Sequence, residues 1–381
     1  MNQKFGRSRL DSAVYFLCIM SFVIASIPIA VAVPLHRIKL PKGFSISHFA
    51  NVPNARQLVR GSRGIVYVGT RSAGSVYAVV DENGDNHADK VHMIAKGLYM
   101  PSGVAYRNGT LYVAAVNQIL AFDRIDERLE SPPKPRIVYD QLPHDSHHGW
   151  KFIDFGPDGK LYIPVGAPCN VCIVDDPYGT ILRIDVDDGS MEVVARGVRN
   201  SVGFTWHPKS QELWFTDNGR DWMGDDIPPG ELNRVTRVGQ HFGFPYIHGG
   251  DVMDPKYGTN ARVDDYIEPN LKLGAHVAPL GPLFYTGKQF PPGYHLDLLI
   301  AEHGSWNRSR KSGYRIMRAR FGPGEQIINY EPFATGWLVG EYSWGRPVDL
   351  EQMPDGSILV SDDHVGALYR IFYRQIPKEV E

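Results

Sequence analysis

The chain has 381 residues, of which 43% are hydrophobic, 22% charged and 11% aromatic, values that exclude a disordered or collagen-like chain. The formal net charge is −2, and because no run of Lys or Arg is present, we expect no nucleic-acid partner. The 39 Gly and 28 Pro residues, without long stretches of helix-forming residues, favour short strands joined by turns, so we predict an all-β protein.

Residues 1–32 have the features of a secretory signal peptide. Three basic residues lie within the first nine, an uncharged apolar stretch runs from residue 13 to residue 33, and Ala30-Val31-Ala32 resembles a cleavage site. The alternative is an uncleaved anchor, because 21 apolar residues are enough to span a bilayer. In both cases we predict one exported domain over residues 33–381. It would be periplasmic or secreted, and it would contact a membrane only if the N-terminal segment is retained.

A short unit recurs six times in the rest of the chain. A polar or Gly-rich turn leads into a strand of alternating apolar residues, and a second strand follows. The first strands of the units are Gly64–Gly69, Asn108–Ala114, Asp158–Val165, Gln211–Asp217, Asp297–Glu302 and Asp355–Ser361. The second strands are Ser75–Asp81, Gln118–Asp123, Thr180–Val186, Glu231–Val238, Gly313–Phe321 and Ala367–Tyr373. Six such units predict a six-bladed β-propeller, a ring of sheets that limits exposed sheet edges.

The fourth and fifth units are separated by a longer interval than the others. This interval contains an insertion rich in Gly, Pro, Tyr and His, from Gly239 to Ala278. A seventh blade within it is the alternative to six.

The turn after the first unit carries closely spaced oxygen side chains. Asp81, Asn83, Asp85 and Asp89 occupy positions 1, 3, 5 and 9 of a calcium-loop pattern, but the glycine expected at position 6 is Asn86. The segment also lies where a hairpin turn is expected. A plain turn is therefore the favoured interpretation, with these four residues kept as possible calcium ligands.

Cys169 and Cys172 are the cysteines that remain once the signal segment is removed. An oxidising compartment favours a disulfide between them. Haem attachment would need a histidine where Ile173 stands, and a zinc site would need two further ligands. We predict a structural disulfide.

Polar side chains precede the third and fourth units. His147 lies in the loop before the third unit, where an imidazole suits a general base, although from the residues alone a structural histidine is the favoured interpretation. Arg199 and Asn200 precede the fourth unit, and a guanidinium beside an amide suits a planar polyanion. Because loops from every blade gather at one end of a propeller, we expect these residues to converge.

Further polar loops flank the later units. The segment 216–226 is the most acidic and turn-rich of the chain, and its carboxylates and loop carbonyls suit a calcium ion. His303 begins a loop after the fifth unit that runs to Arg308, and Arg346 precedes the sixth unit.

Taken together, these segments resemble the glucose/sorbosone dehydrogenase family, whose members are secreted six-bladed propellers that use pyrroloquinoline quinone (PQQ). The matching segments are His147-x-x-x-Lys151 before FGPDGKLYI, then GVRN, TDNGRDWMGDD followed by ELN, AEHGSWNR, and GRPVDL with PDGSILVSDD. The resemblance extends over about residues 40–373.

The resemblance implies a role for each matching residue. His147 would be the catalytic base that takes the proton of a substrate hydroxyl. The residues expected to contact the quinone are Arg199, Asn200 and Arg346, to which we add Lys151 and His303. The backbone carbonyls of Gly219 and Arg220 would hold a calcium ion. Two positions depart from the family pattern: a second last-blade arginine is replaced by Val348, and a first-blade glutamine is replaced near Pro101.

We therefore expect PQQ- and calcium-dependent oxidation of a sugar or a related alcohol or aldehyde, with an external electron acceptor. A calcium-dependent, lactonase-like propeller hydrolase is one alternative, which would need Glu, Asn and Asp side chains converging on a central metal. A non-catalytic propeller that binds carbohydrate or protein is the other.

Overall fold

The structure, a computed structural model, describes Met1 and residues 33–374. The signal segment predicted over residues 1–32 lies outside the described residues, so its cleavage and the export of the chain stay predictions. In the described part no helix has the length and apolarity needed to cross a bilayer. The helices there are single 3-10 turns: η1 (Leu35–Arg37), η2 (Ile125–Glu127), η3 (Val263–Asp265), η4 (Pro292–Tyr294) and η5 (Pro323–Glu325).

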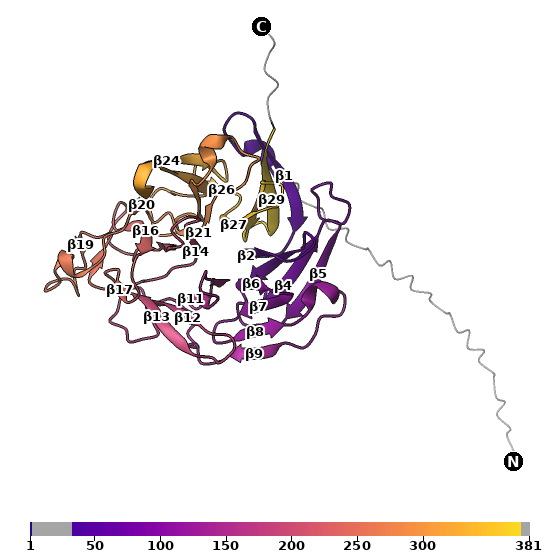
Figure 1. Ribbon diagram of the computed structural model, residues 1–381, viewed down its shortest axis with the longest axis horizontal. Coiled ribbons are helices and arrows are strands. Elements are labelled where there is room, and N and C mark those ends of the chain that lie inside the picture. Colours follow the sequence, from indigo (N-terminus) through magenta and orange to yellow (C-terminus); the bar gives the residue numbers. More distant parts are fainter. Residues whose placement is uncertain (2–32, 375–381) are drawn as a thin grey trace, which may run out of the picture. The chain divides into compact units, whose positions relative to one another are not determined.

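Six sheets surround a common centre, which confirms the prediction of a six-bladed β-propeller (Figure 1). Blade 1 is β2 (Ala55–Arg60), β3 (Val66–Thr70), β4 (Ser75–Val80) and β5 (Lys90–Lys96). Blade 2 is β6 (Gly103–Arg107), β7 (Thr110–Ala114), β8 (Ile119–Phe122) and β9 (Arg136–Tyr139). Blade 3 is β10 (Asp154–Phe155), β11 (Leu161–Val165), β12 (Thr180–Ile184), β13 (Met191–Arg196) and the added strand β17 (Gln240–His241).

The other three blades follow the same order. Blade 4 is β14 (Phe204–Trp206), β15 (Leu213–Asp217), β16 (Pro229–Val235) and β20 (Leu271–Ala275). Blade 5 is β21 (Pro279–Phe284), β22 (Leu298–Glu302), β23 (Arg315–Phe321) and β24 (Ile327–Ala334). Blade 6 is β27 (Pro347–Gln352), β28 (Ile358–Asp362), β29 (Ala367–Tyr373) and β1 (Phe44–Asn51). The repeated pairs found in the sequence are the second and third strands of each blade.

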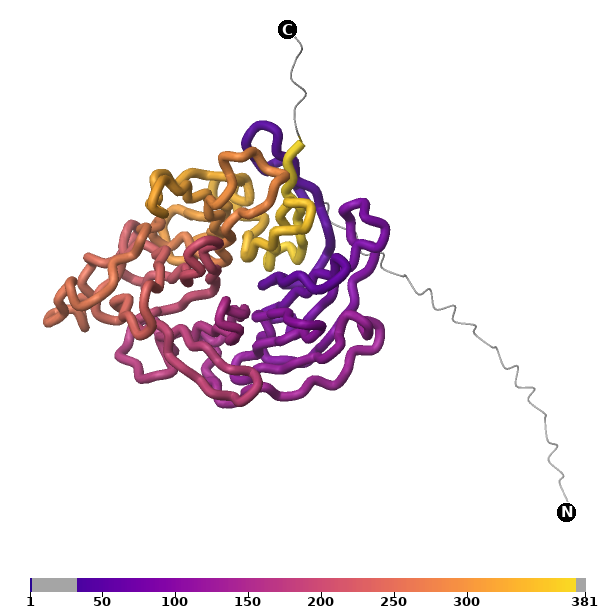
Figure 2. The backbone as a smooth tube through the Cα atoms, in the orientation of Figure 1, coloured from indigo at the N-terminus to yellow at the C-terminus, as the bar shows by residue number. Residues whose placement is uncertain are grey.

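The ring is closed by the two ends of the described propeller. Strand β1 pairs antiparallel with β29, from Phe44 opposite Tyr373 to Asn51 opposite Ala367, and Figure 2 shows the indigo start of the chain beside its yellow end. The ring of Phe44 packs edge-on against Phe290 and Phe333 of blade 5, with centroids 4.7 and 5.1 Å away. Hydrogen bonds and aromatic packing therefore hold the closure.

The hydrophobic core lies mainly between adjacent blades, because each alternating strand buries side chains on both faces of its sheet. One cluster joins blades 1 and 2 through Tyr67, Leu111 and Phe122, and another joins blades 4 and 5 through Trp214 and Phe284. The blades are thus held as a rigid ring that fixes the loops at its ends.

The insertion does not form a seventh blade. Within residues 239–278, strand β17 extends blade 3, β20 completes blade 4, and β18 (Ile247–His248) with β19 (Val252–Met253) makes a two-stranded hairpin. A second small hairpin, β25 (Leu338–Val339) with β26 (Tyr342–Ser343), precedes blade 6. The long interval in the sequence therefore supplies the outer strand of blade 4, β20, after a long loop that contains β17 and the β18–β19 hairpin.

Candidate functional site

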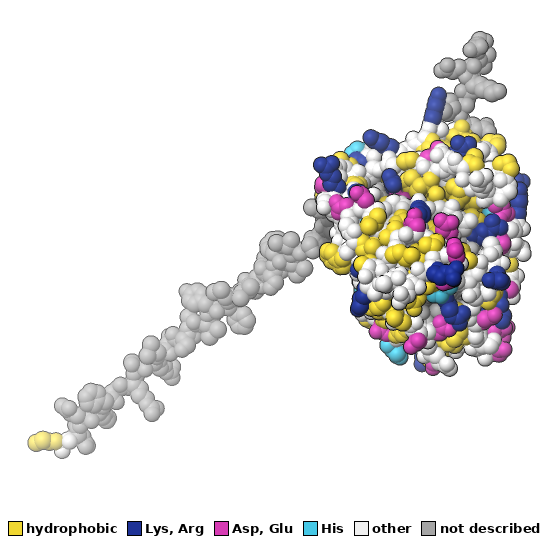
Figure 3. All heavy atoms as spheres, turned by 90° about the vertical axis from the view of Figure 1, so that its left-hand side faces the viewer, with side chains coloured by type: hydrophobic (Ala, Val, Ile, Leu, Met, Phe, Trp, Pro, Cys, Tyr) yellow, Lys and Arg dark blue, Asp and Glu magenta, His cyan; other side chains and the backbone are white. Residues whose placement is uncertain are grey.

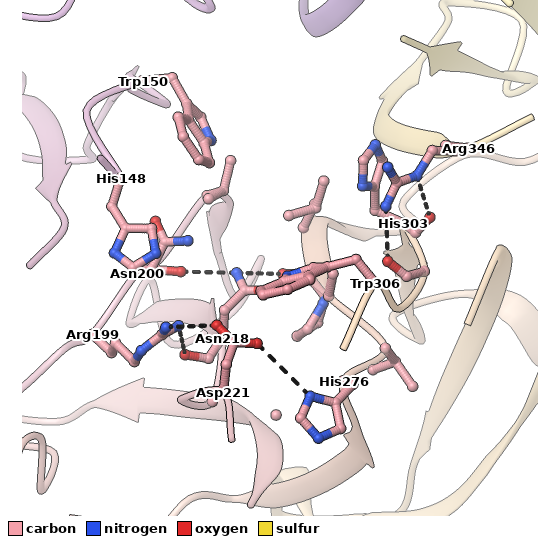
Figure 4. A pocket seen from close by; sticks show the side chains of 18 of the residues that line it. His148, Trp150, Arg199, Asn200, Asn218, Asp221, His276, His303, Trp306 and Arg346 are labelled. Carbon is pink, nitrogen blue, oxygen red and sulfur yellow. Dashed lines mark hydrogen bonds and ion pairs between the residues drawn. The ribbon is translucent and has the colours of Figure 1, made fainter. Parts of the chain in front are cut away.

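A cavity of about 520 Å³ lies where the loops of several blades meet (Figure 4). Its residues come from two kinds of position. Some directly follow the second strand of a blade, as Arg71, Asn218 and His303 do, and others come just before the first strand, as Asn200 and Arg346 do. On the side of the molecule shown in Figure 3, basic and acidic side chains are interspersed.

Most of the site residues predicted from the sequence converge on this cavity. Those that line it are His147, Arg199, Asn200, Gly219, His303 and Arg346. The exceptions are Lys151, Arg220 and the four residues of the Asp81 turn, which lie outside the lining.

Two adjacent histidines face the cavity, with ring centroids 4.1 Å apart. His147 is exposed, whereas His148 is buried and its Nδ1 lies 2.8 Å from the carbonyl oxygen of Ala167. Because a carbonyl can only accept, Nδ1 carries the proton, which leaves the lone pair of Nε2 available. His148 is therefore held in the tautomer that a general base needs.

Local backbone geometry fixes His148 in this position. Its φ of 53° is in the left-handed region, which is rare for a residue with a side chain. A Cβ on Gly166 would lie 2.6 Å from the Cβ of His148 and 3.2 Å from Oδ1 of Asn200, so only glycine allows both to approach the cavity here.

Both imidazoles are uncharged at neutral pH. Burial and the nearby Arg199 guanidinium lower the pKa of His148 from 6.5 to about 2. The same two causes lower the pKa of the exposed His147. Burial and the neighbouring arginine thus keep a nitrogen of each ring free to accept a proton.

Arg199 is buried and its guanidinium is held on several sides. Nε donates to the carbonyl of Asn170 (2.8 Å), Nη2 to Oδ1 of Asn170 (2.9 Å), and Nη1 to the carbonyl of Asn218 (3.1 Å). Its one ion pair among the described residues is with Asp221, at 3.3 Å. Most of its hydrogen bonds are therefore to neutral acceptors, which position the cation without cancelling its charge.

The backbone of the Arg199–Asn200 pair is anchored by Asp217 at the end of β15. Its carboxylate accepts from the backbone N–H of Arg199 (2.8 Å) and of Asn200 (2.7 Å). The side chain of Asn218 donates to the carbonyl of Asn200 at 2.9 Å. The amide of Asn200 faces the cavity as a result (Figure 4).

The opposite wall comes from blades 5 and 6. Arg346 donates to the carbonyls of His303 (3.2 Å) and Gly304 (2.8 Å). His303 is 2.8 Å from Asp363, which also pairs with Arg56 at 2.8 Å. Burial outweighs Asp363 and lowers the pKa of His303 to about 4, while His303 and Arg56 hold the pKa of Asp363 far below its usual range. His303 is thus a neutral, hydrogen-bonded part of the wall.

Several cavity residues were not predicted from the sequence, and Arg71 is the most informative of them. Its guanidinium lies 3.8 Å from the centroid of Trp150 and, within the described part of the chain, forms no ion pair. Asp221 also lines the cavity and lies 4.0 Å from His276. A signal for Arg71 was present, because it directly follows the second strand of its blade.

Two tryptophans lie at the rim. Trp306 lines the cavity, its ring contacts Trp222 edge-on with centroids 5.5 Å apart, and each residue is 68% exposed. Arg308 ties their loops together by binding the carbonyl of Asp225 (2.9 Å) and the carboxylate of Asp226 (2.7 Å). Exposed aromatic surface of this kind is typical of a binding site.

Lys151 was predicted as a cofactor contact, but it lies in an adjoining small cavity with Gln57 and Asp349. Burial lowers its pKa to about 8. Val348, where the family resemblance predicts an arginine, packs with Val202 and Leu280 in a small apolar cluster. Lys151 and Val348 therefore both lie outside the lining of the larger cavity.

The Asp81 turn joins β4 to β5 as a hairpin, which is the plain-turn interpretation. Asp81 accepts from the backbone N–H of Gly84 (2.8 Å) and Asn86 (2.9 Å), and Asp89 accepts from that of Glu82 (2.7 Å). Its carboxylates are occupied by their own loop and lie away from the cavity.

The predicted calcium loop is divided between two environments. Gly219 lines the cavity, whereas the side chain of Arg220 turns to Asp254 of the insertion at 2.6 Å. No group of three or more His, Cys, Asp or Glu side chains among the described residues is arranged to hold a metal ion. Calcium at the carbonyls of residues 219 and 220 stays a prediction.

A sequence model of the family described as Glucose / Sorbosone dehydrogenase matches residues 106–370, more than half of the chain. The chain belongs to the glucose/sorbosone dehydrogenase family. A Borreliella burgdorferi protein described as uncharacterized is 35% identical to this family member over 378 residues, which cover 95% of the chain and 98% of the relative. The pyrroloquinoline quinone-dependent pyranose dehydrogenase of Coprinopsis cinerea is 26% identical over 262 residues, which are 61% of the chain but only 33% of that protein.

Solved structures share the fold of this glucose/sorbosone dehydrogenase family member. A Trichoderma reesei enzyme of Carbohydrate-Active Enzymes Family AA12 has a TM-score of 0.75 at 19% identity, covering 88% of the chain and 98% of that structure. The PQQ domain of pyranose dehydrogenase from Coprinopsis cinerea, in its holo form, has a TM-score of 0.73 at 16% identity, with coverages of 88% and 97%. PQQ-bound aldose sugar dehydrogenase from Streptomyces coelicolor has a TM-score of 0.62 at 19% identity, with coverages of 88% and 100%.

Proposed function

We propose that this chain is a PQQ- and calcium-dependent dehydrogenase that oxidises a hydroxyl or aldehyde group of a sugar or related compound. One observation carries the proposal: a single cavity combines several guanidinium groups, an amide and an oriented neutral imidazole. These are the groups that a flat anionic cofactor and a substrate hydroxyl require together.

The residues present fit the quinone. Arg199, Arg346 and Arg71 would bind the carboxylates of the quinone, and the amide of Asn200 would form a hydrogen bond with polar atoms at the edge of its ring system. The cavity of about 520 Å³ is within the usual size range for small-molecule sites. The glycine at position 166 keeps one wall open beside Asn200. When bound, the cofactor supplies the two-electron acceptor that no protein side chain provides.

We assign the calcium ion to the backbone at Gly219, which lines the cavity. A Cβ there would lie 2.8 Å from the carbonyl of Pro229, so the loop can approach closely only with glycine. The carbonyl oxygens of residues 219 and 220 would be the protein's hard oxygen ligands for calcium.

We assign proton abstraction to the histidine pair, with Nε2 of His148 as the favoured base. The sequence predicts His147 for this role, and His147 also lines the cavity. The geometry favours His148, because Ala167 fixes its Nδ1 proton and its ring orientation. A base oriented by a third group is the usual arrangement at catalytic sites.

The proposal is tested by titrating purified protein with PQQ, with and without calcium, while recording absorbance and dye-linked oxidation of a sugar panel. A quinone spectrum perturbed only with calcium present, together with turnover, is the expected result. Absence of quinone binding at micromolar concentration would reject the proposal. Lactone hydrolysis without quinone would then indicate the lactonase-like alternative, and sugar binding without turnover the non-catalytic one.

The acidic limb of kcat/KM is expected at a lower pH than an unperturbed histidine, with a pKa of about 6.5, would give. Burial and Arg199 lower the pKa of both cavity histidines, so the neutral base persists as the pH falls. Rates measured over a range from about pH 4.5 to about pH 9 check this expectation. A half-maximal point at about pH 6.5 or higher would show that the base is an unperturbed imidazole.

Substituting Arg71 by glutamine is expected to raise the Kd for quinone roughly tenfold, because an unpaired cation of the cavity is lost. At saturating quinone, kcat should change little, since Arg71 is not the base. Arg63→Gln, an exposed blade-1 arginine outside the lining, is the control. Equal affinities for the two variants would place Arg71 outside the cofactor contacts.

A further inference from the structure

The segment between β11 and β12 contains a short loop closed by the disulfide between Cys169 and Cys172. Asn170 is the first residue inside this loop and is partly buried. The loop belongs to blade 3, but Asn170 makes its hydrogen bonds to residues of the blade-4 loops. The disulfide therefore closes a structure that reaches across to the neighbouring blade.

Asn170 joins two parts of the candidate site. Its carbonyl and Oδ1 accept from Nε and Nη2 of Arg199, at 2.8 and 2.9 Å. Its Oδ1 also accepts from the backbone N–H of Asp221 at 2.8 Å, and its Nδ2 donates to the carbonyl of Asp221 at 3.1 Å. One side chain thus fixes both the guanidinium and the loop that contains Gly219.

The chemistry of an asparagine suits this position. The side-chain amide has an acceptor oxygen and a donor nitrogen, which bond to the backbone N–H and the carbonyl of Asp221, and it carries no charge. A carboxylate in the same place would hold Arg199 equally well but would neutralise it. Without Asn170, Asp221 would be the main remaining side-chain partner of Arg199, and the cation would be drawn into that ion pair.

The disulfide has a physical role in this arrangement. A free four-residue loop loses conformational entropy when Asn170 is fixed, and a covalent closure reduces that loss by restricting the open states. Reduction should therefore loosen Asn170 without removing any of its hydrogen-bonding groups. The position of Arg199 should then depend on whether Cys169 and Cys172 are joined as a disulfide or reduced to thiols.

We propose that Asn170, held by the Cys169–Cys172 disulfide, is a positioning residue that aligns Arg199 and the Gly219–Asp221 loop for the anionic cofactor. This inference rests on the proposed function for its ligand. The hydrogen bonds that align these residues lie within the protein, so they can be measured in the absence of any cofactor.

The first measurement is amide hydrogen exchange in quinone-free protein. Asn170→Ala should exchange at least tenfold faster at the amide of Asp221, which loses its acceptor, while Asn170→Asp retains that acceptor and should stay protected. Asn329→Ala, an exposed asparagine of β24, is the matched control and should leave this amide unchanged. Unchanged exchange in Asn170→Ala would overturn the proposal.

The second measurement is quinone affinity. Asn170→Ala should raise the Kd tenfold or more, with kcat at saturating quinone nearly unchanged. Asn170→Asp should also weaken binding although its loop stays protected, because the new carboxylate neutralises Arg199, a result that a merely structural role would not give. Wild-type protein reduced with dithiothreitol, and the double variant Cys169→Ser with Cys172→Ser, should be intermediate.

The possible failures are distinguishable. If wild-type protein binds quinone normally and Asn170→Ala binds equally well, the positioning role is overturned while the proposed function stands. If wild-type protein binds no quinone, the proposed function is rejected, and the assignment of quinone as the ligand is rejected as well.

Discussion

Replacing His148 by asparagine is expected to lower kcat for sugar oxidation by about 10²- to 10⁴-fold, the usual contribution of a positioned general base. The substituted side chain could not take a proton, although its amide could still hydrogen-bond the carbonyl that His148 contacts. Quinone affinity should be nearly retained, because no positive charge is removed. The measurement is single-turnover reduction of bound quinone by the substrate.

His147→Asn is the matched control for this prediction, since the two rings are neighbours and both line the cavity. We expect it to lower the rate by less than tenfold. The reverse outcome, with a large loss only in His147→Asn, would assign the base to the residue that the sequence predicts. Thermal unfolding of both variants separates a catalytic loss from a loss of fold.

Substituting Arg199 by methionine is expected to weaken quinone binding by about 100-fold or more. The change removes a cation and leaves the carbonyls of Asn170 and Asn218 and the carboxylate of Asp221 without their donor. Truncating one partner of a buried charged hydrogen bond typically costs about 2–5 kcal/mol, which corresponds to about 30- to several thousand-fold in affinity. Isothermal titration with PQQ and calcium measures the loss.

Arg196→Met is the control for this substitution. Arg196 lies three residues earlier in the chain, is partly exposed and pairs with Asp176 at 2.7 Å. Because surface ion pairs contribute little, its affinity and stability should resemble those of the wild type. Comparable losses in the two variants would mean that Arg199 acts through the fold and not on the cofactor.

The fold could be predicted because its signal is local and repeated. Segments such as DGKLYIPV and NGTLYVA each combine a turn with an alternating strand, and six of them specify a ring. The insertion was less predictable. Strand β20 pairs with β16 only after the chain has made a long excursion, and nothing within residues 271–275 alternates strongly enough to show it.

The site was only partly predictable, because orientation decides which neighbouring residue faces the cavity. His147 and His148 are indistinguishable in sequence, and the positive φ and the Ala167 contact that separate them arise from folding. Lys151, only four residues after His147, lies instead in a small adjoining cavity with Gln57 and Asp349. Arg71 was detectable in principle from its place after β3.

Strand β1 ties closure of the ring to the last strand of the described chain. Phe44 pairs with Tyr373, so β1, the first strand of the described residues, has no partner for its pairing edge until β29 has been synthesised. Arg346 and Asp363 belong to the blade that this meeting completes. Blade 6 is therefore incomplete in a nascent chain until residue 373 has been made, and removing either residues 44–51 or residues 367–373 should disrupt the candidate cavity.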